Sequence, residues 1–151
     1  MKLVVQRVRS TRVVVDGEAV AAIGPGLLVL AGVARGDTPD DARHLACKVA
    51  GLRIFDDEQG KLNRAVGEAG GALLVVSQFT LYADCARGHR PGFADAALPD
   101  EAVLLLDRFV QELRSLGREV RTGRFGARML VELQNDGPVT LILESRGRRG
   151  A

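Results

Sequence analysis

Two stretches of the sequence are apolar at consecutive positions, and they constrain the fold more than any other feature. One covers residues 27–33, LLVLAGV, and the other covers residues 72–76, ALLVV. Successive side chains of a strand point to opposite faces of a sheet, so a strand that is apolar on both sides needs cover on both faces. We therefore predict a central strand over 27–33 and a second strongly apolar strand over 72–76.

The remaining predicted strands are punctuated by turns. Asp16-Gly17 supplies the positive φ angles of a two-residue hairpin turn. Around it and later in the chain the pattern predicts strands at 2–8, 12–15, 18–20, 52–55, 119–121, 129–133 and 139–143. Residues 83–99 have the composition of a loop. The strand-rich order favours a largely antiparallel sheet.

Two helices are expected. Thr38 is suited to an N-cap and Pro39 to the first helical position, and apolar residues then recur at helical spacing. A second helix is predicted from about Asp100 to Leu116, with Gly117 as its stop signal. Two helices within a strand-rich order predict a single domain of the α+β class.

The domain is predicted to cover residues 1–145. With 151 residues, 46% of them hydrophobic and 26% charged, the chain fits one soluble domain with a core of ordinary size. Residues 146–151 form an arginine-rich tail without large apolar side chains, and we expect it to be frayed. The net charge of +2 argues against a protein that coats nucleic acid without specificity, while local contact with a few phosphates stays open.

Neither the cysteines nor the histidines indicate a metal site. Cys47 and Cys85 are far apart, no CxxC occurs, and His44 and His89 do not have ligand spacing. We expect no metal and no cofactor. No signal peptide is recognisable, and no apolar stretch approaches the ~20 residues that span a bilayer, so we expect a cytoplasmic protein with reduced thiols and no membrane contact.

The sequence contains no familiar catalytic motif, and two other segments are the candidates for a functional site. At residues 77–81, SQFTL, an apolar strand suddenly acquires hydroxyls and an amide. The simple interpretation is a strand end that satisfies its own backbone, and the functional one is a site where N–H groups and hydroxyls meet a developing oxyanion. At residues 135–140, NDGPVT, the simple interpretation is a hairpin turn. Alternatively, a cis peptide at Gly137-Pro138 would present a rigid surface of main-chain atoms.

Together these two segments resemble the D-aminoacyl-tRNA deacylase family. The resemblance extends over residues 1–145. It also includes Gln6-Arg7-Val8, Asp16-Gly17 and residues 23–30, 52–55, 90–91 and 122–126. It implies a compact β-barrel-like fold and a homodimer that hydrolyses the ester joining a D-amino acid to the 3′ end of tRNA. Removal of glycine from mischarged tRNA is implied as well.

The resemblance also assigns roles to residues. It implies that Gly137 and Pro138, joined by a cis bond, complete the active site of the other subunit, with Arg7 nearby to hold the loop. The carbonyl groups of this loop would hold the amino group of the substrate and leave no room for an L side chain. The partner is then the 3′ acceptor end of an aminoacyl-tRNA, and no DNA is expected.

On the other side of the site, the N–H groups of Phe79 and Thr80 would stabilise the oxyanion, and Ser77 and Gln78 would position the ester or the terminal adenosine. The hydroxyl of Thr80 is a possible nucleophile, but the sequence offers no base to activate it, so we favour a main-chain role. Phe125 and Met129 are either pocket walls or ordinary core residues.

Two departures from the family pattern lie in the loop before residue 99. Cys85-Ala86-Arg87 stands where a Thr and more basic residues are frequent, and Gly92 stands where a Ser is frequent. Two other functions stay open: an RNA-binding module without catalysis, and a hydrolase of small esters that depends on Thr80.

Overall fold

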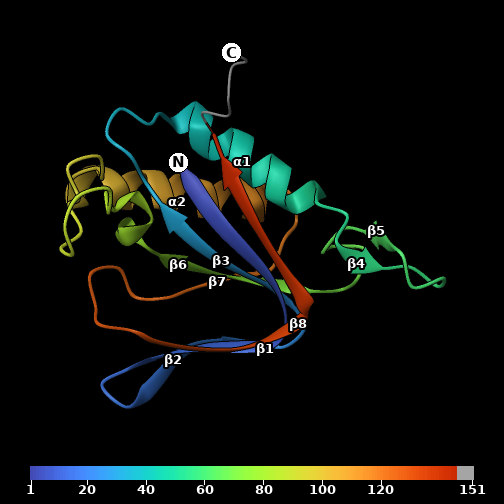
Figure 1. Cartoon of the computed structure of the whole chain (residues 1–151). Coiled ribbons are helices and arrows are strands. Elements are labelled where there is room, and N and C mark those ends of the chain that lie inside the picture. The colour runs from blue at the N-terminus through green and yellow to red at the C-terminus, as the bar shows by residue number, and fades with distance from the viewer. Residues whose placement is uncertain (146–151) are drawn as a thin grey trace.

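Two helices cover one face of a strongly curved sheet in the computed structural model, which describes residues 1–145 (Figure 1). The predicted tail at 146–151 lies outside the described residues. In chain order the elements are β1 (Lys2–Val15), β2 (Glu18–Ile23), β3 (Gly26–Gly32), α1 (Pro39–Gly51), β4 (Phe55–Asp56), β5 (Leu62–Arg64), β6 (Ala72–Ser77), the 3-10 turn η1 (Phe79–Tyr82), α2 (Pro99–Ser115), β7 (Val120–Thr122) and β8 (Leu130–Glu144). The α+β class with two main helices is confirmed.

Strand β1 organises the main sheet, whose order is β2-β1-β3-β6-β7 with β8 also paired to β1. All the pairings of β1 are antiparallel, whereas β3–β6 and β6–β7 are parallel. The sheet is therefore mixed. Its ends approach each other where β2 meets β7, so that it nearly closes into a barrel (Figure 1).

The alternation of side chains along β3 divides the interior into two cores. Leu27 and Val29 face the larger core, which fills the space between the sheet and the two helices. Leu28 faces the smaller core inside the curved sheet. Along β6, Leu73 and Leu74 are divided between the two cores in the same way. The prediction of a central strand covered on both faces is confirmed, because both cores depend on β3.

Local capping signals place the first helix as predicted. Thr38 accepts a hydrogen bond from the N–H of Asp41, and the Asp41 carboxylate accepts one from the N–H of Thr38. This reciprocal pair is a capping box, and it fixes the start of α1. Helix α2 lies within one residue of its predicted bounds, and Gly117 follows it with a φ of 76°.

Several predicted strand boundaries are wrong. The segments 2–8 and 12–15 are parts of one strand, β1, and 129–133 and 139–143 are parts of one strand, β8. The interpretation of 135–140 as a hairpin turn is therefore wrong as well. The reason is that β1 and β8 pair with each other on both sides of the interruption, so neither chain reverses there. Within 52–55, only the last residue belongs to a strand.

Strand β6 agrees with its prediction at 72–76 to within one residue. It stops at Ser77, and residues 79–82 form η1 instead of continuing the strand. Among residues 1–145, no helix has the length and the apolar character needed to cross a membrane.

Candidate functional site

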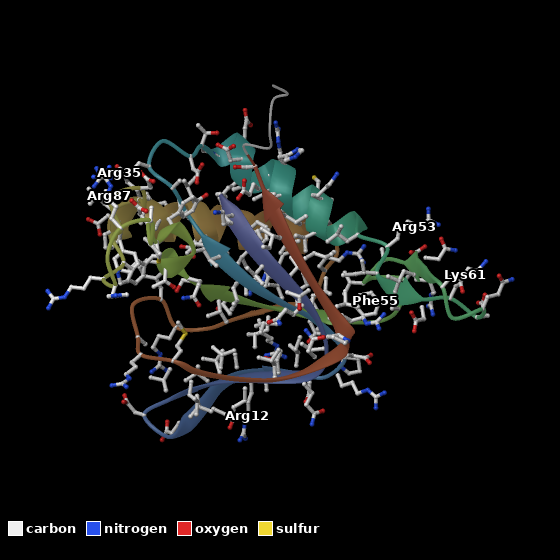
Figure 2. All side chains as sticks on the ribbon, viewed as in Figure 1. Arg12, Arg35, Arg53, Phe55, Lys61 and Arg87 are labelled. Carbon is white, nitrogen blue, oxygen red and sulfur yellow. The ribbon has the colours of Figure 1, made fainter. Side chains whose placement is uncertain are left out.

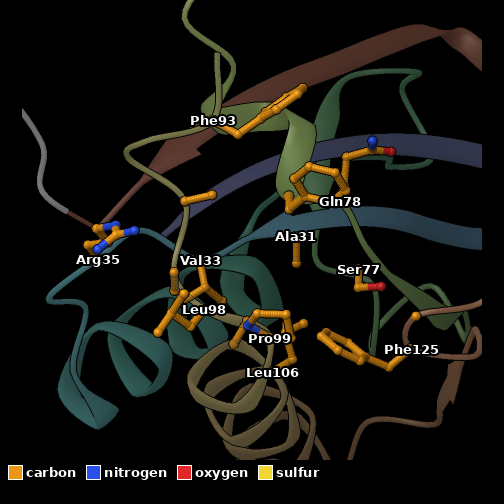
Figure 3. Close-up of a pocket in the computed structure, with 15 residues that line it drawn as sticks. Ala31, Val33, Arg35, Ser77, Gln78, Phe93, Leu98, Pro99, Leu106 and Phe125 are labelled. Atoms are coloured by element: carbon orange, nitrogen blue, oxygen red, sulfur yellow. The ribbon is translucent and has the colours of Figure 1, made fainter. Parts of the chain in front are cut away.

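A predominantly apolar pocket of about 400 Å³ opens where β3 and β6 end beside the start of α2 (Figure 3). Its walls come from the ends of the two strands, from η1, from the loop before α2 and from the loop after β7. They are formed by Ala31, Val33, Arg35, Ser77, Gln78, Phe79, Phe93, Ala96, Ala97, Leu98, Pro99, Ala102, Leu106, Phe125 and Gly126. A concave apolar space with a few polar groups at its edge is the usual form of a small-ligand site.

Close packing against β3 fixes the position of η1. The N–H of Gln78 donates to the carbonyl of Ala31 at 2.8 Å, which holds the chain where β6 ends. A Cβ added to Gly32 would lie 2.9 Å from the carbonyl oxygen of Gln78, so only glycine allows this approach. The turn therefore begins directly over the end of the neighbouring strand.

The first two N–H groups of η1 are available, and the first of them belongs to the pocket residue Phe79. The N–H of Leu81 donates to the carbonyl of Gln78 at 3.2 Å. For the N–H groups of Phe79 and Thr80, residues 1–145 provide no acceptor. The first residues of a helical turn lack partners within the turn, so these two donors can serve a bound group.

Side chains at η1 leave Thr80 without a base. The side-chain amide of Gln78 donates to the hydroxyl oxygen of Thr80, and an amide does not accept a proton at neutral pH. Thr80 is exposed, and it does not line the pocket. The ring of Phe79 is 57% exposed and meets the ring of Phe93 edge to face, with 5.0 Å between centroids.

The second predicted segment interrupts β8 opposite Arg7. Gln6 pairs with Thr140 and Val8 pairs with Asn135, so residues 136–139 bulge out against a single residue of β1. The Gly137-Pro138 peptide inside this bulge is cis, as the family resemblance implies. Residues 135–139 are called the Gly-Pro loop below.

Arg7 fastens the Gly-Pro loop to the rest of the chain. Its Nε donates to the carbonyl of Asp136 at 2.9 Å, and its Nη1 donates to the carbonyl of Ile54 at 2.9 Å. Nη1 also lies 3.3 Å from Oδ1 of Asp56. The side chain of Arg7 is only 9% exposed, so these contacts are largely shielded from water. The expected position of Arg7 beside the loop is confirmed.

Asn135 braces the loop from within. Its Oδ1 accepts from the N–H of Val139 at 2.8 Å, and its Nδ2 donates to the hydroxyl oxygen of Thr140 at 3.0 Å. Gly137 has a φ of +137°, and a Cβ there would lie 2.7 Å from Cγ2 of Val139 and 3.2 Å from Nη2 of Arg7. The loop thus has one well-supported shape that requires glycine at this position.

The β4–β5 hairpin supports the same cluster from outside. Asp56 belongs to β4, and Asp57 begins the turn to β5. A hydrogen bond from the backbone N–H of Lys61 lowers the pKa of Asp57, and the N–H of Gln59 and the side chain of Asn63 act in the same direction against the effect of burial. The ionised carboxylate thus organises the turn next to Asp56, which contacts Arg7.

The structure sorts the predicted site residues into two groups. Ser77, Gln78, Phe79 and Phe125 line the pocket, and Figure 3 shows Ser77 and Phe125 side by side at one end of it. The second group is formed by Arg7, Gly137 and Pro138, none of which lines the pocket. In Figure 1 the bend of β8 lies well away from η1. Within one chain, therefore, the two groups do not form a common site.

Met129 belongs to neither group. It packs against the smaller core, and its sulfur would lie 2.8 Å from a Cβ added to Gly123. His44, His89, Cys47 and Cys85 are all exposed. Among residues 1–145, no three His, Cys, Asp or Glu side chains are placed to hold a metal ion together.

Three residues at the pocket or beside Arg7 were not predicted from the sequence. Phe93 lines the pocket, and an aromatic residue in a loop of small and polar residues is a signal that could have found it. Arg35 at the pocket edge and Asp56 beside Arg7 have no local signal, because their neighbours come from distant parts of the chain.

Comparison with known proteins gives a consistent result. A family model described as D-Tyr-tRNA(Tyr) deacylase matches residues 4–144. The chain is 58% identical over 147 residues to the D-aminoacyl-tRNA deacylase of Heliobacterium modesticaldum, covering 97% of this chain and 98% of that protein. It is likewise 58% identical over 146 residues to the D-aminoacyl-tRNA deacylase of Chlorobaculum tepidum, with coverage of 96% and 97%.

Two solved structures share the architecture. One, described as "c-Myc DNA Unwinding Element Binding Protein", superimposes with a TM-score of 0.91 at 41% identity and covers 95% of this chain and 98% of its own. The other, described as "Structural Analysis of a probable eukaryotic D-amino acid tRNA deacylase", has a TM-score of 0.78 at 18% identity with the same coverage. The second likeness supports the fold alone.

Proposed function

The chain belongs to the D-Tyr-tRNA(Tyr) deacylase family, and we propose that it hydrolyses the ester bond between a D-amino acid and the 3′ end of tRNA. The products are a free D-amino acid and tRNA. The observation that carries this proposal is the pair of available N–H groups at Phe79 and Thr80 beside an apolar pocket, in a chain whose relatives bear the name of that activity.

An aminoacyl ester is already activated, so the site needs orientation and charge stabilisation more than a strong nucleophile. In the proposed reaction, water adds to the ester carbonyl, and the N–H groups of Phe79 and Thr80 stabilise the resulting oxyanion. The bond to the ribose oxygen then breaks, and that oxygen takes up a proton. Ser77 and Gln78 position the ester and the terminal adenosine, whose base fits the apolar pocket beside Phe125.

We further propose that the protein acts as a homodimer in which the Gly-Pro loop of one chain completes the pocket of the other. Two observations support this arrangement. Within one chain the loop and the pocket are separate, and β8 exposes large apolar side chains that a second copy could cover: Leu130, Leu133 and Ile142. A heterologous or a two-fold contact could deliver the loop, and two-fold dimers are by far the commonest.

The loop would then select substrates by exclusion. The carbonyl groups of Gly137 and Pro138 accept hydrogen bonds from the amino group of the substrate, and their rigid support leaves no space for an L side chain. A D side chain points to the open side, and glycine has no side chain to clash. Glycyl-tRNA is therefore a second proposed substrate.

Matched D-Tyr-tRNA, L-Tyr-tRNA and Gly-tRNA test this proposal with the purified full chain. We expect rapid release of D-tyrosine and glycine and negligible release of L-tyrosine. The same assay in the presence of a chelator asks whether a metal ion takes part, and we expect unchanged rates. Equal rates with D- and L-Tyr-tRNA would contradict selection by exclusion, and no release from any of the three would contradict the proposed activity.

Binding of nucleic acid without catalysis is the second candidate. It is favoured by the similarity to the 41% identical structure, which is described as a protein that binds a DNA unwinding element. A chain that binds tRNA or DNA in a salt-sensitive manner and releases no amino acid would support this candidate. If the chain hydrolyses the D ester, binding of nucleic acid would only accompany the enzyme activity.

A further inference from the structure

The arginines of residues 1–145 differ in whether the fold uses their side chains. Most of them are engaged by a carboxylate, a carbonyl or an amide within the chain, as with Arg7, Arg12 and Arg108. Others in this group are Arg9, Arg43, Arg53, Arg64, Arg114, Arg118 and Arg121. The remaining guanidinium groups have no hydrogen bond or ion pair within residues 1–145, and they belong to Arg35, Arg87, Arg90, Arg124 and Arg128.

These unengaged arginines, called the rim arginines below, all belong to segments that contribute residues to the pocket wall. Arg35 lines it directly, at the end opposite Ser77 (Figure 3). Arg87 and Arg90 lie in the loop that leads to the pocket residue Phe93, and in Figure 2 Arg87 projects at the same end of the molecule as Arg35. Arg124 directly precedes the pocket residue Phe125, and Arg128 follows the pocket residue Gly126 by two positions, so each rim arginine either lines the pocket or belongs to a segment that contributes to its wall.

Nearby carboxylates do not neutralise the rim arginines through direct contact. Asp84 accepts a hydrogen bond from the N–H of Ala86 at 2.9 Å, and Asp37 binds the amino group of Met1 at 2.6 Å. Neither Asp95 nor Asp100, which lie in the same stretch of chain, comes within ion-pair distance of a guanidinium in the part of the chain that the structure describes. The guanidinium groups therefore remain free to meet an external anion, and their planar shape suits phosphate.

An exposed aromatic pair accompanies this charge. The rings of Phe79 and Phe93 are 57% and 37% exposed, and both residues belong to the pocket wall. Two further exposed apolar residues, Leu98 and Phe125, also line this pocket, so apolar surface is concentrated there. Positive groups that follow a backbone, combined with aromatic surfaces for bases, are the typical means of binding single-stranded nucleic acid.

We propose that the rim arginines bind the phosphates of the single-stranded 3′ end of the RNA substrate, and that the Phe79–Phe93 pair stacks a base next to the terminal nucleoside. This inference rests on the proposed function, because it requires the terminal adenosine to lie in the pocket. The chain then leaves the pocket past the rim, where each guanidinium can meet one phosphate. The rim arginines supply affinity for RNA and take no part in the ester chemistry.

The test compares two substrates that differ in phosphate. D-Tyr-tRNA carries the whole acceptor strand, whereas the D-tyrosyl ester of adenosine carries no phosphate at all. For Arg87→Gln, Arg90→Gln, Arg124→Gln and Arg128→Gln, we expect kcat/KM with D-Tyr-tRNA to fall by about two- to fivefold per substitution, as for one exposed ion pair. Hydrolysis of the adenosine ester should stay unchanged. Arg43→Gln and Arg108→Gln, which remove engaged arginines from the two helices, are the matched controls.

Salt dependence gives the more specific readout. Each lost phosphate contact should make the slope of log(kcat/KM) against log[salt] shallower by about 0.7 for D-Tyr-tRNA. The slope of the control variants should equal that of the wild type. Phe93→Leu should lower kcat/KM with D-Tyr-tRNA about tenfold through lost stacking, and the salt slope should stay unchanged.

The outcomes separate this inference from the function on which it rests. If the variant with all four substitutions keeps the wild-type slope and still hydrolyses both substrates, the rim arginines do not bind RNA, while the proposed function stands. Equal losses with both substrates would also overturn the inference, because the arginines would then act on the pocket itself. If the wild type hydrolyses neither substrate, the proposed function fails and the inference fails with it.

Discussion

The turn η1 follows the end of β6 and the Gly-Pro loop interrupts β8 in the same sheet, but the fold leaves the backbone groups of the first available and fastens the second. At η1 the N–H groups of Phe79 and Thr80 have no acceptor within residues 1–145, and the adjoining pocket is lined mainly by apolar side chains. At the Gly-Pro loop, Arg7 and Asn135 supply hydrogen bonds to the backbone on both sides of Gly137.

This difference is consistent with the division of labour proposed for the two segments. Groups that stabilise developing charge must be available to the substrate, so they cannot be consumed by the fold. A surface that rejects one enantiomer must keep its shape, so its backbone has to be held by side chains. Substitutions in one segment at a time should therefore remove only the function expected of that segment.

The largest effect is expected from removing a single N–H at η1. Phe79 is the first residue of the turn, where proline is tolerated, and Gln78 before it, with φ −147° and ψ 77°, lies outside the helical region that a following proline disfavours. Phe79→Pro should lower kcat with D-Tyr-tRNA by about 100- to 1,000-fold, the usual cost of losing one oxyanion donor. Phe79→Ala is the control, since it loses the same ring and keeps the N–H. Equal activity of the two variants would contradict the oxyanion role.

The second-largest effect on activity is expected from a change in the shape of the Gly-Pro loop. Gly137→Ala adds a methyl group 2.7 Å from Val139 and 3.2 Å from Arg7, at a φ of +137°. We expect kcat/KM to fall about 100-fold through misplacement of the loop, with a dimer and a folded chain retained. Gly17→Ala is the control, because Gly17 also has positive φ but nothing lies within 4 Å of its added Cβ. Full activity and D-selectivity of Gly137→Ala would rule out this role of the loop.

Loss of the side chain that fastens the loop should affect stability as well as activity. Arg7→Gln removes the donor to Ile54 and the contact with Asp56, and we expect the free energy of unfolding to fall by about 2–3 kcal/mol. Activity should fall by about tenfold, since the loop then relaxes. Arg9→Gln is the control, because Arg9 is 76% exposed and lies 3.7 Å from the Asp136 carboxylate. Equal unfolding energies in urea for the two variants would show that Arg7 does not hold the loop.

The smallest effect is expected at the Thr80 hydroxyl. Its hydrogen-bond partner is the amide of Gln78, which cannot act as a base. Thr80→Ala should therefore cost about fivefold or less in kcat, the scale of one neutral hydrogen bond. A loss of several orders of magnitude that Thr80→Ser restores would identify the hydroxyl as the nucleophile and would contradict the main-chain account.

Local signals explain which parts of this molecule the sequence could predict. The continuous apolar run at 27–33 required cover on both faces, and Thr38 with Pro39 marked the start of α1. Each of these depends on neighbours along the chain. The segments 77–81 and 135–140 were also recognised, because abrupt polar groups at a strand end and a Gly-Pro peptide are visible locally.

What the sequence could not predict depends on distant partners. Gly-Pro in a polar segment resembles a hairpin turn, and only the long partner β1 shows that β8 continues through it. Arg7 finds its acceptors 47 and 129 residues away, so no spacing pattern marks them.

The most direct test of the two-segment account mixes two inactive variants. Phe79→Pro damages the pocket and keeps the loop, whereas Gly137→Ala damages the loop and keeps the pocket. If the loop of one chain completes the pocket of the other, a mixed dimer contains one intact site, and random exchange of subunits should restore about one quarter of the wild-type activity with D-Tyr-tRNA. If each chain forms its own site, the mixture will stay as inactive as its components, and the account will be wrong.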